Sequence, residues 1–343
     1  LARPDDAVVF LAGGGISQTA AITAKDLAIR AGTVDGSTGE VVLDNSANQV
    51  GTVAATLQGG RFNFTNGSAL SVGTVSDGVN SVSGVITNNG VTSIFTTAGN
   101  LVIASPINAG TAGVNLNVGG AISGNGVKGA SLNASASGGM SLSTQVGMLS
   151  ANNTGANTEI AFNNDGPLLI QSLIQPSSSS GSINVDNVGA LTVGSGSLAV
   201  SLAVSSSSGA IHLTGRNALT VNGGISSESG NIHLLAYPSG VVGHGDTLTL
   251  SNTGAVFSNT GNISLRAGDH IVIANGANIS STLGRVTQSP NLNVPPPPSL
   301  SECKLNPALS GCASVLPTLN QCIATPSLNG CSVVLPTMAE CTA

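Results

Sequence analysis

The sequence has little aromatic and little charged character. It contains no tryptophan, one tyrosine and six phenylalanines, and charged residues make up 7% of its 343 positions. A globular protein has about 25% charged residues, so this composition argues against a globular enzyme. The net charge is −6 with only nine lysines and arginines, which gives no cationic surface for nucleic acid.

Long apolar runs are also missing. Hydrophobic residues make up 41% of the chain, which is too many for a disordered protein. They alternate with polar residues, which excludes a membrane helix of about 20 apolar residues, and no segment carries the apolar stripe of a long helix. Small and β-branched residues with 46 glycines predict an all-β chain of short strands joined by tight turns.

Two short phrases alternate through residues 180–273. The first reads SGSINV, SGAIHL, SGNIHL and TGNISL, and the second reads GALTV, NALTV, DTLTL and DHIVI. The glycines of the first phrase (Gly181, Gly209, Gly230 and Gly261) are 28, 21 and 31 residues apart, a spacing typical of solenoids. Because a two-strand unit cannot bury its apolar face alone, neighbouring units must stack.

Stacking predicts rows of equivalent side chains. Two interior rows are Ile183, Ile211, Ile232 and Ile263, and Leu191, Leu219, Leu248 and Ile271. Asparagines near turns are predicted to form ladders between coils or to adopt left-handed backbone, at Asn184, Asn222, Asn231, Asn252, Asn262 and Asn275. With about 21 residues per coil and about 4.8 Å between coils, residues 1–289 are predicted to form a parallel β-helix solenoid of about 13 coils and about 65 Å.

Two features of this repeat are candidates for function. His212 and His233 occupy the same position of the phrase, one coil apart, and are predicted to stack about 4.8 Å apart on the outer face. A metal-binding or pH-sensing pair is one interpretation, and a pair of solvated surface histidines is the favoured one. The insertion over residues 235–246 interrupts the repeat, and solenoid binding faces often grow from insertions, so Tyr237, Pro238 and His244 are predicted contact residues.

The composition changes at residue 290. Residues 290–300 form a proline-rich linker, and residues 301–343 form a tail in which 303–321 and 322–340 match at 9 of 19 positions. All five cysteines lie in this tail, at Cys303, Cys312, Cys322, Cys331 and Cys341. Zinc sites normally pair cysteines closely and include histidine, so disulfides in an oxidising compartment are the favoured interpretation. The pairing stays open, and the odd cysteine either pairs between chains or marks a cut in a longer array.

The same residues carry a resemblance. The GxIxL phrases, the stretch VVLDNSANQVGTVAATLQGGRFNFTNGSALSVGTV (residues 41–75) and the proline run followed by cysteine repeats resemble filamentous haemagglutinin-like exoproteins. These are large secreted adhesins of the two-partner secretion type in Gram-negative bacteria. The resemblance, from about Ala12 to the end, implies a right-handed β-helix, export through an outer-membrane pore partner, and surface attachment or biofilm formation. The family's secretion domain is not apparent, so the chain corresponds to a shaft with its cysteine-repeat tail.

The sequence therefore favours a non-enzymatic, extracellular, rod-like adhesin that contacts a host or neighbouring-cell surface, with no catalytic residue, cofactor or metal assigned. An alternative is a subunit of an extracellular filament, joined end to end with disulfide support from the tail. A second alternative is a β-helix enzyme acting on polysaccharide. Such an enzyme needs clustered carboxylates and aromatic platforms, whereas the 15 acidic residues are adjacent only at Asp5 and Asp6.

Overall fold

The structure is a computed structural model of the chain. It describes residues 2–32, 37–79, 81–176, 180–195, 202–238 and 245–290. The cysteine tail, with its five disulfide candidates, lies outside the described residues, as does the predicted linker beyond Pro290. Within the described ranges the chain has strands and no helix, so the predicted all-β class is confirmed.

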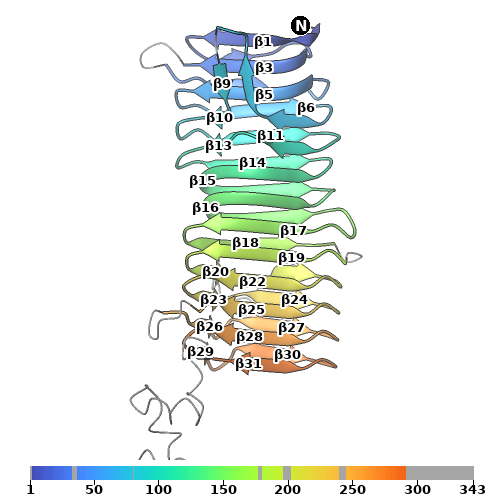
Figure 1. The fold of residues 1–343 in the computed structure, drawn as a ribbon, viewed down its shortest axis with the longest axis vertical. Coiled ribbons are helices and arrows are strands. Elements are labelled where there is room, and N and C mark those ends of the chain that lie inside the picture. The colour runs from blue at the N-terminus through green and yellow to red at the C-terminus, as the bar shows by residue number, and fades with distance from the viewer. Residues whose placement is uncertain are drawn as a thin grey trace, which may run out of the picture. The chain divides into compact units, whose positions relative to one another are not determined.

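Thirteen parallel strands stack in one continuous ladder, which we call face 1 (Figure 1). Each strand pairs with the equivalent strand of the next coil. The strands of face 1 are β1 (Ala2–Ala12), β3 (Thr23–Ala31), β5 (Gln49–Leu57), β7 (Leu70–Val72), β12 (Leu101–Ile103), β15 (Ile122–Ala136), β16 (Met140–Asn153), β17 (Ile160–Asp165), β19 (Ile183–Val188), β22 (Ile211–Gly215), β25 (Ile232–Ala236), β28 (Ile263–Ala267) and β31 (Val286–Ser289). The predicted parallel β-solenoid is therefore confirmed.

Shorter parallel strands complete each coil. In the amino-terminal half they are β2 (Ile16–Ser17), β4 (Val41–Leu43), β6 (Phe62–Asn66), β10 (Val85–Ile86), β11 (Thr92–Thr96), β13 (Ile107–Asn108) and β14 (Gly113–Val118). In the carboxyl-terminal half they are β18 (Leu168–Ile174), β20 (Leu191–Val193), β21 (Leu202–Ser206), β23 (Leu219–Val221), β24 (Gly224–Ser227), β26 (Leu248–Leu250), β27 (Ala255–Ser258), β29 (Ile271–Ile273) and β30 (Asn278–Ser281). The long strands β15 and β16 run through nearly a whole coil each and link the two sets.

The core consists of rows of apolar side chains that point into the coils. Both predicted rows form in register: Ile183 pairs with Ile211, then Ile232, then Ile263, and Leu191 leads through Leu219 and Leu248 to Ile271. All of these are buried except Ile271, which is partly buried in the last complete coil. Each buried aliphatic side chain contributes roughly 1.5–3 kcal/mol, so stability grows with the number of coils.

A serine at the third residue before glycine shapes one corner of the coils. The serines are Ser206, Ser227, Ser258 and Ser281. In each case the serine Oγ accepts a hydrogen bond from the main-chain N–H of the glycine three residues later. The hydroxyl of Ser258 also donates to the carbonyl oxygen of Gly230 in the preceding coil, at 3.1 Å. One side chain thus closes its own turn and binds the neighbouring coil.

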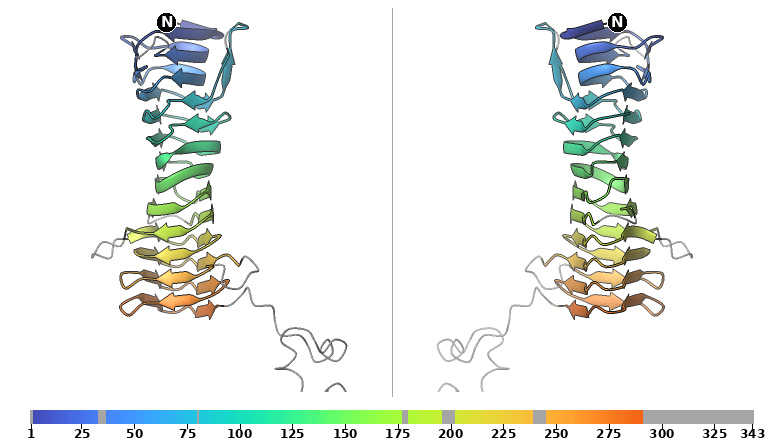
Figure 2. Two further views of the ribbon diagram at one scale, coloured as in Figure 1. Left: turned by 90° about the vertical axis from the view of Figure 1, so that its left-hand side faces the viewer. Right: turned by 90° about the vertical axis from the view of Figure 1, so that its right-hand side faces the viewer.

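An antiparallel hairpin departs from the solenoid. It comprises β8 (Thr74–Ser76) and β9 (Ser81–Ser83). Figure 2 shows it standing beside the first coils and running along their stacking direction, so it crosses their strands. Its Val75 and Val82 pack against the outward-facing Ala28 and Ala54, so small alanines on face 1 make room for it.

Candidate functional surfaces

The predicted contact insertion connects β25 to β26. Tyr237 follows β25 directly and is 43% exposed, while Pro238 is half-buried. His244 lies outside the described residues. The structure therefore places part of the predicted contact site at the surface.

Tyr237 belongs to a small charged cluster on the outer side of face 1. The guanidinium of Arg216 lies 5.1 Å from the centre of the Tyr237 ring. The same guanidinium donates two hydrogen bonds to Asp186, from Nη2 at 2.6 Å and from Nε at 3.1 Å. This bidentate geometry fixes the arginine over the ring, although an exposed pair adds little to stability.

A polar row crosses four coils next to this cluster. The amide nitrogen of Asn184 donates to a carboxylate oxygen of Glu159. Its amide oxygen therefore faces the Nδ1 of His212, at 2.9 Å, and accepts a hydrogen bond from the Nδ1–H. His212 in turn stacks on His233, with ring centres 4.7 Å apart and planes at 2°. The predicted stack is confirmed, and the hydrogen bond leaves Nε2 of neutral His212 without its proton.

His233 should titrate differently from an isolated histidine. Burial lowers the pKa of His233 below its ordinary 6.5, and the charges of His212 and Arg266 lower it further. The stability that neutral His233 contributes is thus present above about pH 6.5 and is lost as the pH falls through its folded pKa. We expect an NMR titration of the imidazole protons to give a midpoint below 6.5 for His233, and His212→Ala to raise it.

His270 provides the control for this titration. It is exposed and lies outside the stack. His270→Ala should leave the His233 midpoint where it was. A His233 midpoint above 6.5, or one that His212→Ala does not move, would contradict the stacked geometry in solution.

Two aspartates are brought together at the base of the insertion. Asp246 and Asp269 are both buried. The main-chain N–H of Asp269 donates to the carbonyl oxygen of Asp246 at 3.0 Å, and a carboxylate oxygen of Asp269 accepts from the N–H of Gly245 at 3.0 Å. The two residues are 23 positions apart in the sequence, so their contact was not among the sequence-based expectations. Each aspartate opens the second repeat phrase, so the two occupy equivalent positions of successive coils. That equivalence in the sequence could have predicted their contact.

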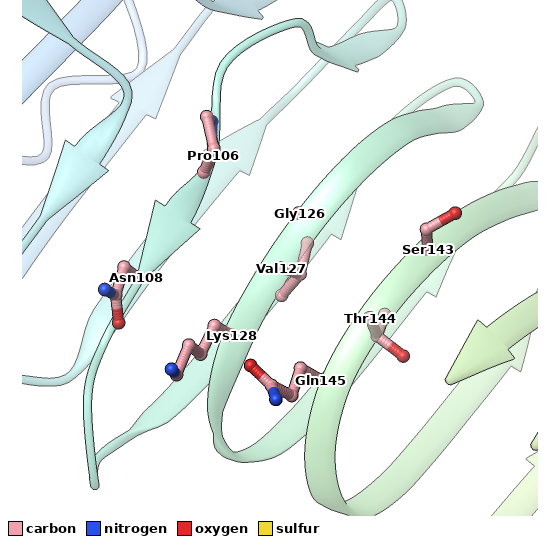
Figure 3. A pocket seen from close by; sticks show the side chains of 8 residues that line it. All are labelled: Pro106, Asn108, Gly126, Val127, Lys128, Ser143, Thr144 and Gln145. Atoms are coloured by element: carbon pink, nitrogen blue, oxygen red, sulfur yellow. The ribbon is translucent and has the colours of Figure 1, made fainter. Parts of the chain in front are cut away.

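A groove of about 270 Å³ lies over β13, β15 and β16 (Figure 3). Asn108, Lys128 and Gln145 are register partners on these three strands and line it together. At its floor, Gly126 forms a bulge with φ +86° against Pro106, and the missing side chain leaves the groove open. Lys128 is the only charged residue between positions 78 and 158, so no carboxylate of that stretch screens its ammonium group. The lining of the groove thus combines one ammonium group with amide and hydroxyl side chains and contains no carboxylate.

Other site classes find little support in the part of the chain that the structure describes. There, histidine, cysteine, aspartate and glutamate form no group of three or more able to hold a metal ion. The described residues also contain no helix long and apolar enough to cross a membrane. Comparisons of the chain with protein-family models, with curated proteins and with solved structures gave no match.

Proposed function

We propose that this chain is the shaft of a secreted, non-enzymatic surface adhesin of a Gram-negative bacterium. The observation that supports this best is the unbroken ladder of face 1, in which thirteen strands stay in parallel register from β1 to β31. At about 4.8 Å per strand, twelve steps span roughly 58 Å. A continuous ladder of this kind resists bending, because every coil is hydrogen-bonded to its neighbours, and rigidity is what a projecting shaft requires.

The remaining parts of the proposal rest on the family resemblance. The helix is taken as right-handed, the tail as disulfide-linked, and export as proceeding through an outer-membrane pore partner. The adhesive contact is made with a host or neighbouring-cell surface. Charged and aromatic residues are few in this chain, which favours a scaffold with local contact sites over a chain that performs chemistry, and we assign no reaction.

Negative-stain electron microscopy of the purified protein, with and without reductant, tests the architecture. We expect separate rods of about 60 Å that reductant leaves unchanged. Beads coated with the protein should also adhere to cells, and soluble protein should block this adhesion. Globular particles would contradict the shaft, and beads that do not adhere would contradict the adhesive role.

A filament subunit is the second candidate, and one observation favours it. The last described coil carries exposed apolar side chains, with Leu283 77% exposed and Val272 47% exposed. Such an exposed apolar surface favours end-to-end association. Long fibres that fall apart on reduction, in the same microscopy experiment, would replace the shaft by this alternative.

A further inference from the structure

One outward-facing row of side chains alternates between large apolar and small polar residues along the solenoid. Residues Ile174, Ser205, Ser226 and Phe257 are successive register partners on β18, β21, β24 and β27. Ile174 and Phe257 are each 41% exposed. Two small polar residues therefore stand between two large apolar ones, three strand spacings or about 14 Å apart.

This alternation forms a groove of about 570 Å³, which we call the serine groove. Ile174 and Pro176 make one wall, and Phe257 and Asn259 make the other. The floor contains the hydroxyl groups of Ser205, Ser207 and Ser226 with the carboxylate of Glu228. The Oγ of Ser207 donates to Oε2 of Glu228 at 3.3 Å, which holds the carboxylate over the floor.

The chemistry of the groove selects one class of occupant. A hydrocarbon chain would bury the floor hydroxyls and the carboxylate without partners, at a cost of a few kcal/mol for each group. A peptide strand would find no free backbone edge, because β21 and β24 are already paired on both sides. A sugar ring combines an apolar C–H face with hydroxyl groups around its edge, and it matches both the walls and the floor.

We propose that the serine groove binds a neutral pyranose residue of a glycan, with its C–H face against Phe257 and its hydroxyl groups bonded to the floor serines and Glu228. The negative face of the phenyl ring attracts polarised C–H groups, and the serine hydroxyls both donate and accept. This inference rests on the proposed adhesive function, because it names the class of molecule on the contacted cell surface that the shaft would bind.

The chain supplies a matched control. Phe95 lies in the same outward row, where its register partners are Thr65 and Asn117. Asn117 leads through Ser135 and Asn152 to Ile174. Phe95→Ser and Phe257→Ser are thus the same change on the same side of the solenoid, and only Phe257 lines the serine groove.

Saturation-transfer NMR of the full chain with lactose, maltose, cellobiose and mannobiose tests the proposal. We expect at least one disaccharide to bind saturably, with a dissociation constant on the order of 1 mM. Phe257→Ser should weaken that binding about tenfold, and Phe95→Ser should leave it unchanged. Glu228→Gln, which keeps the shape of the side chain, should also weaken binding, so the test does not depend on one variant folding.

Three results would overturn the proposal. These are no saturable binding of any of the disaccharides, binding that survives both groove substitutions, or butylammonium binding that Glu228→Gln abolishes while sugars do not compete. The last result would make the groove a cation site. None of them would alter the rods seen by microscopy or the adhesion of coated beads, so failure here and failure of the shaft are distinguishable.

Discussion

Gly230→Ala should force two neighbouring coils apart and destabilise the solenoid by about 3 kcal/mol. An added Cβ at Gly230 would lie under 3.0 Å from the carbonyl oxygen of Gly209 in the preceding coil. That oxygen belongs to the turn between β21 and β22, and it accepts a hydrogen bond from the Ser227 hydroxyl at 3.2 Å. As backbone packed against the next coil, it cannot swing away as a flexible side chain would. The N–H of Gly230 also donates to Ser227 Oγ at 2.9 Å, so a displaced coil strains this corner as well.

Chemical denaturation and hydrogen exchange should both report this loss. Because coils contact only their neighbours, protection of amide hydrogens from exchange should fall most in β22 and β25. These strands follow Gly209 and Gly230, the two glycines that the substitution would push apart. Gly14→Ala is the control, since no atom lies within 4 Å of a Cβ at Gly14 and its backbone is not left-handed. Equal stability of the two variants would mean that the coils are not packed as closely as the structure has them.

The stacked glycines of the first phrase, Gly181, Gly209, Gly230 and Gly261, could be predicted from the sequence because they recur with the repeat. The glycines that open the first phrase mark the repeat, and their close stacking follows once the coils are in register. The Ser-x-x-Gly spacing at 206 and 209, 227 and 230, 258 and 261, and 281 and 284 is equally visible in the sequence. Local repeats predict local contacts well because each coil repeats the geometry of the last.

Other features could not be predicted from local pattern. Ile174 and Phe257 lie on opposite walls of the serine groove because of the pairing register between successive coils. That register depends on the length of each intervening coil and on its bulges, which no local pattern reveals. Of the six asparagines expected near turns, none has left-handed backbone, which occurs instead at Asn88, Asn89 and Asn157. The expected ladder does form at Asn231 and Asn262, where the Asn231 side chain accepts from the Asn262 N–H at 2.8 Å. The sequence thus predicts that asparagines adopt left-handed backbone and form ladders, but it does not predict which asparagines have the left-handed backbone.

Buried asparagines at strand ends were missed, although alternation points to them. In β17, Ile160 and Phe162 face the core, and period two places Asn164 on the same side. Asn164 is 1% exposed, and its neighbour in the next coil, Asn187, is 0% exposed. Alternation alone predicts an apolar side chain at position 164, whereas the amide found there serves the corner where the chain leaves face 1.

Asn164→Ala should therefore cost about 3 kcal/mol, more than its loss of volume alone would suggest. The amide oxygen of Asn164 accepts from the hydroxyl of Thr144 at 2.8 Å and from the N–H of Val146 at 2.9 Å. Its amide nitrogen donates to Oδ1 of Asn187 at 2.9 Å. Alanine would leave these buried groups without their partner, and an unsatisfied buried group costs about 1–3 kcal/mol.

Asn163→Ala gives the comparison within the same strand, because Asn163 is the exposed neighbour of Asn164 on the opposite side of β17. Denaturant titrations of the two variants should differ by about 3 kcal/mol, with Asn163→Ala close to the unchanged protein. Exchange of the Val146 amide should also accelerate in Asn164→Ala alone, since that N–H loses its acceptor. If both variants were equally stable, water would have to replace the amide at this corner, and the ladder from Thr144 through Asn164 to Asn187 would not be what joins these three coils.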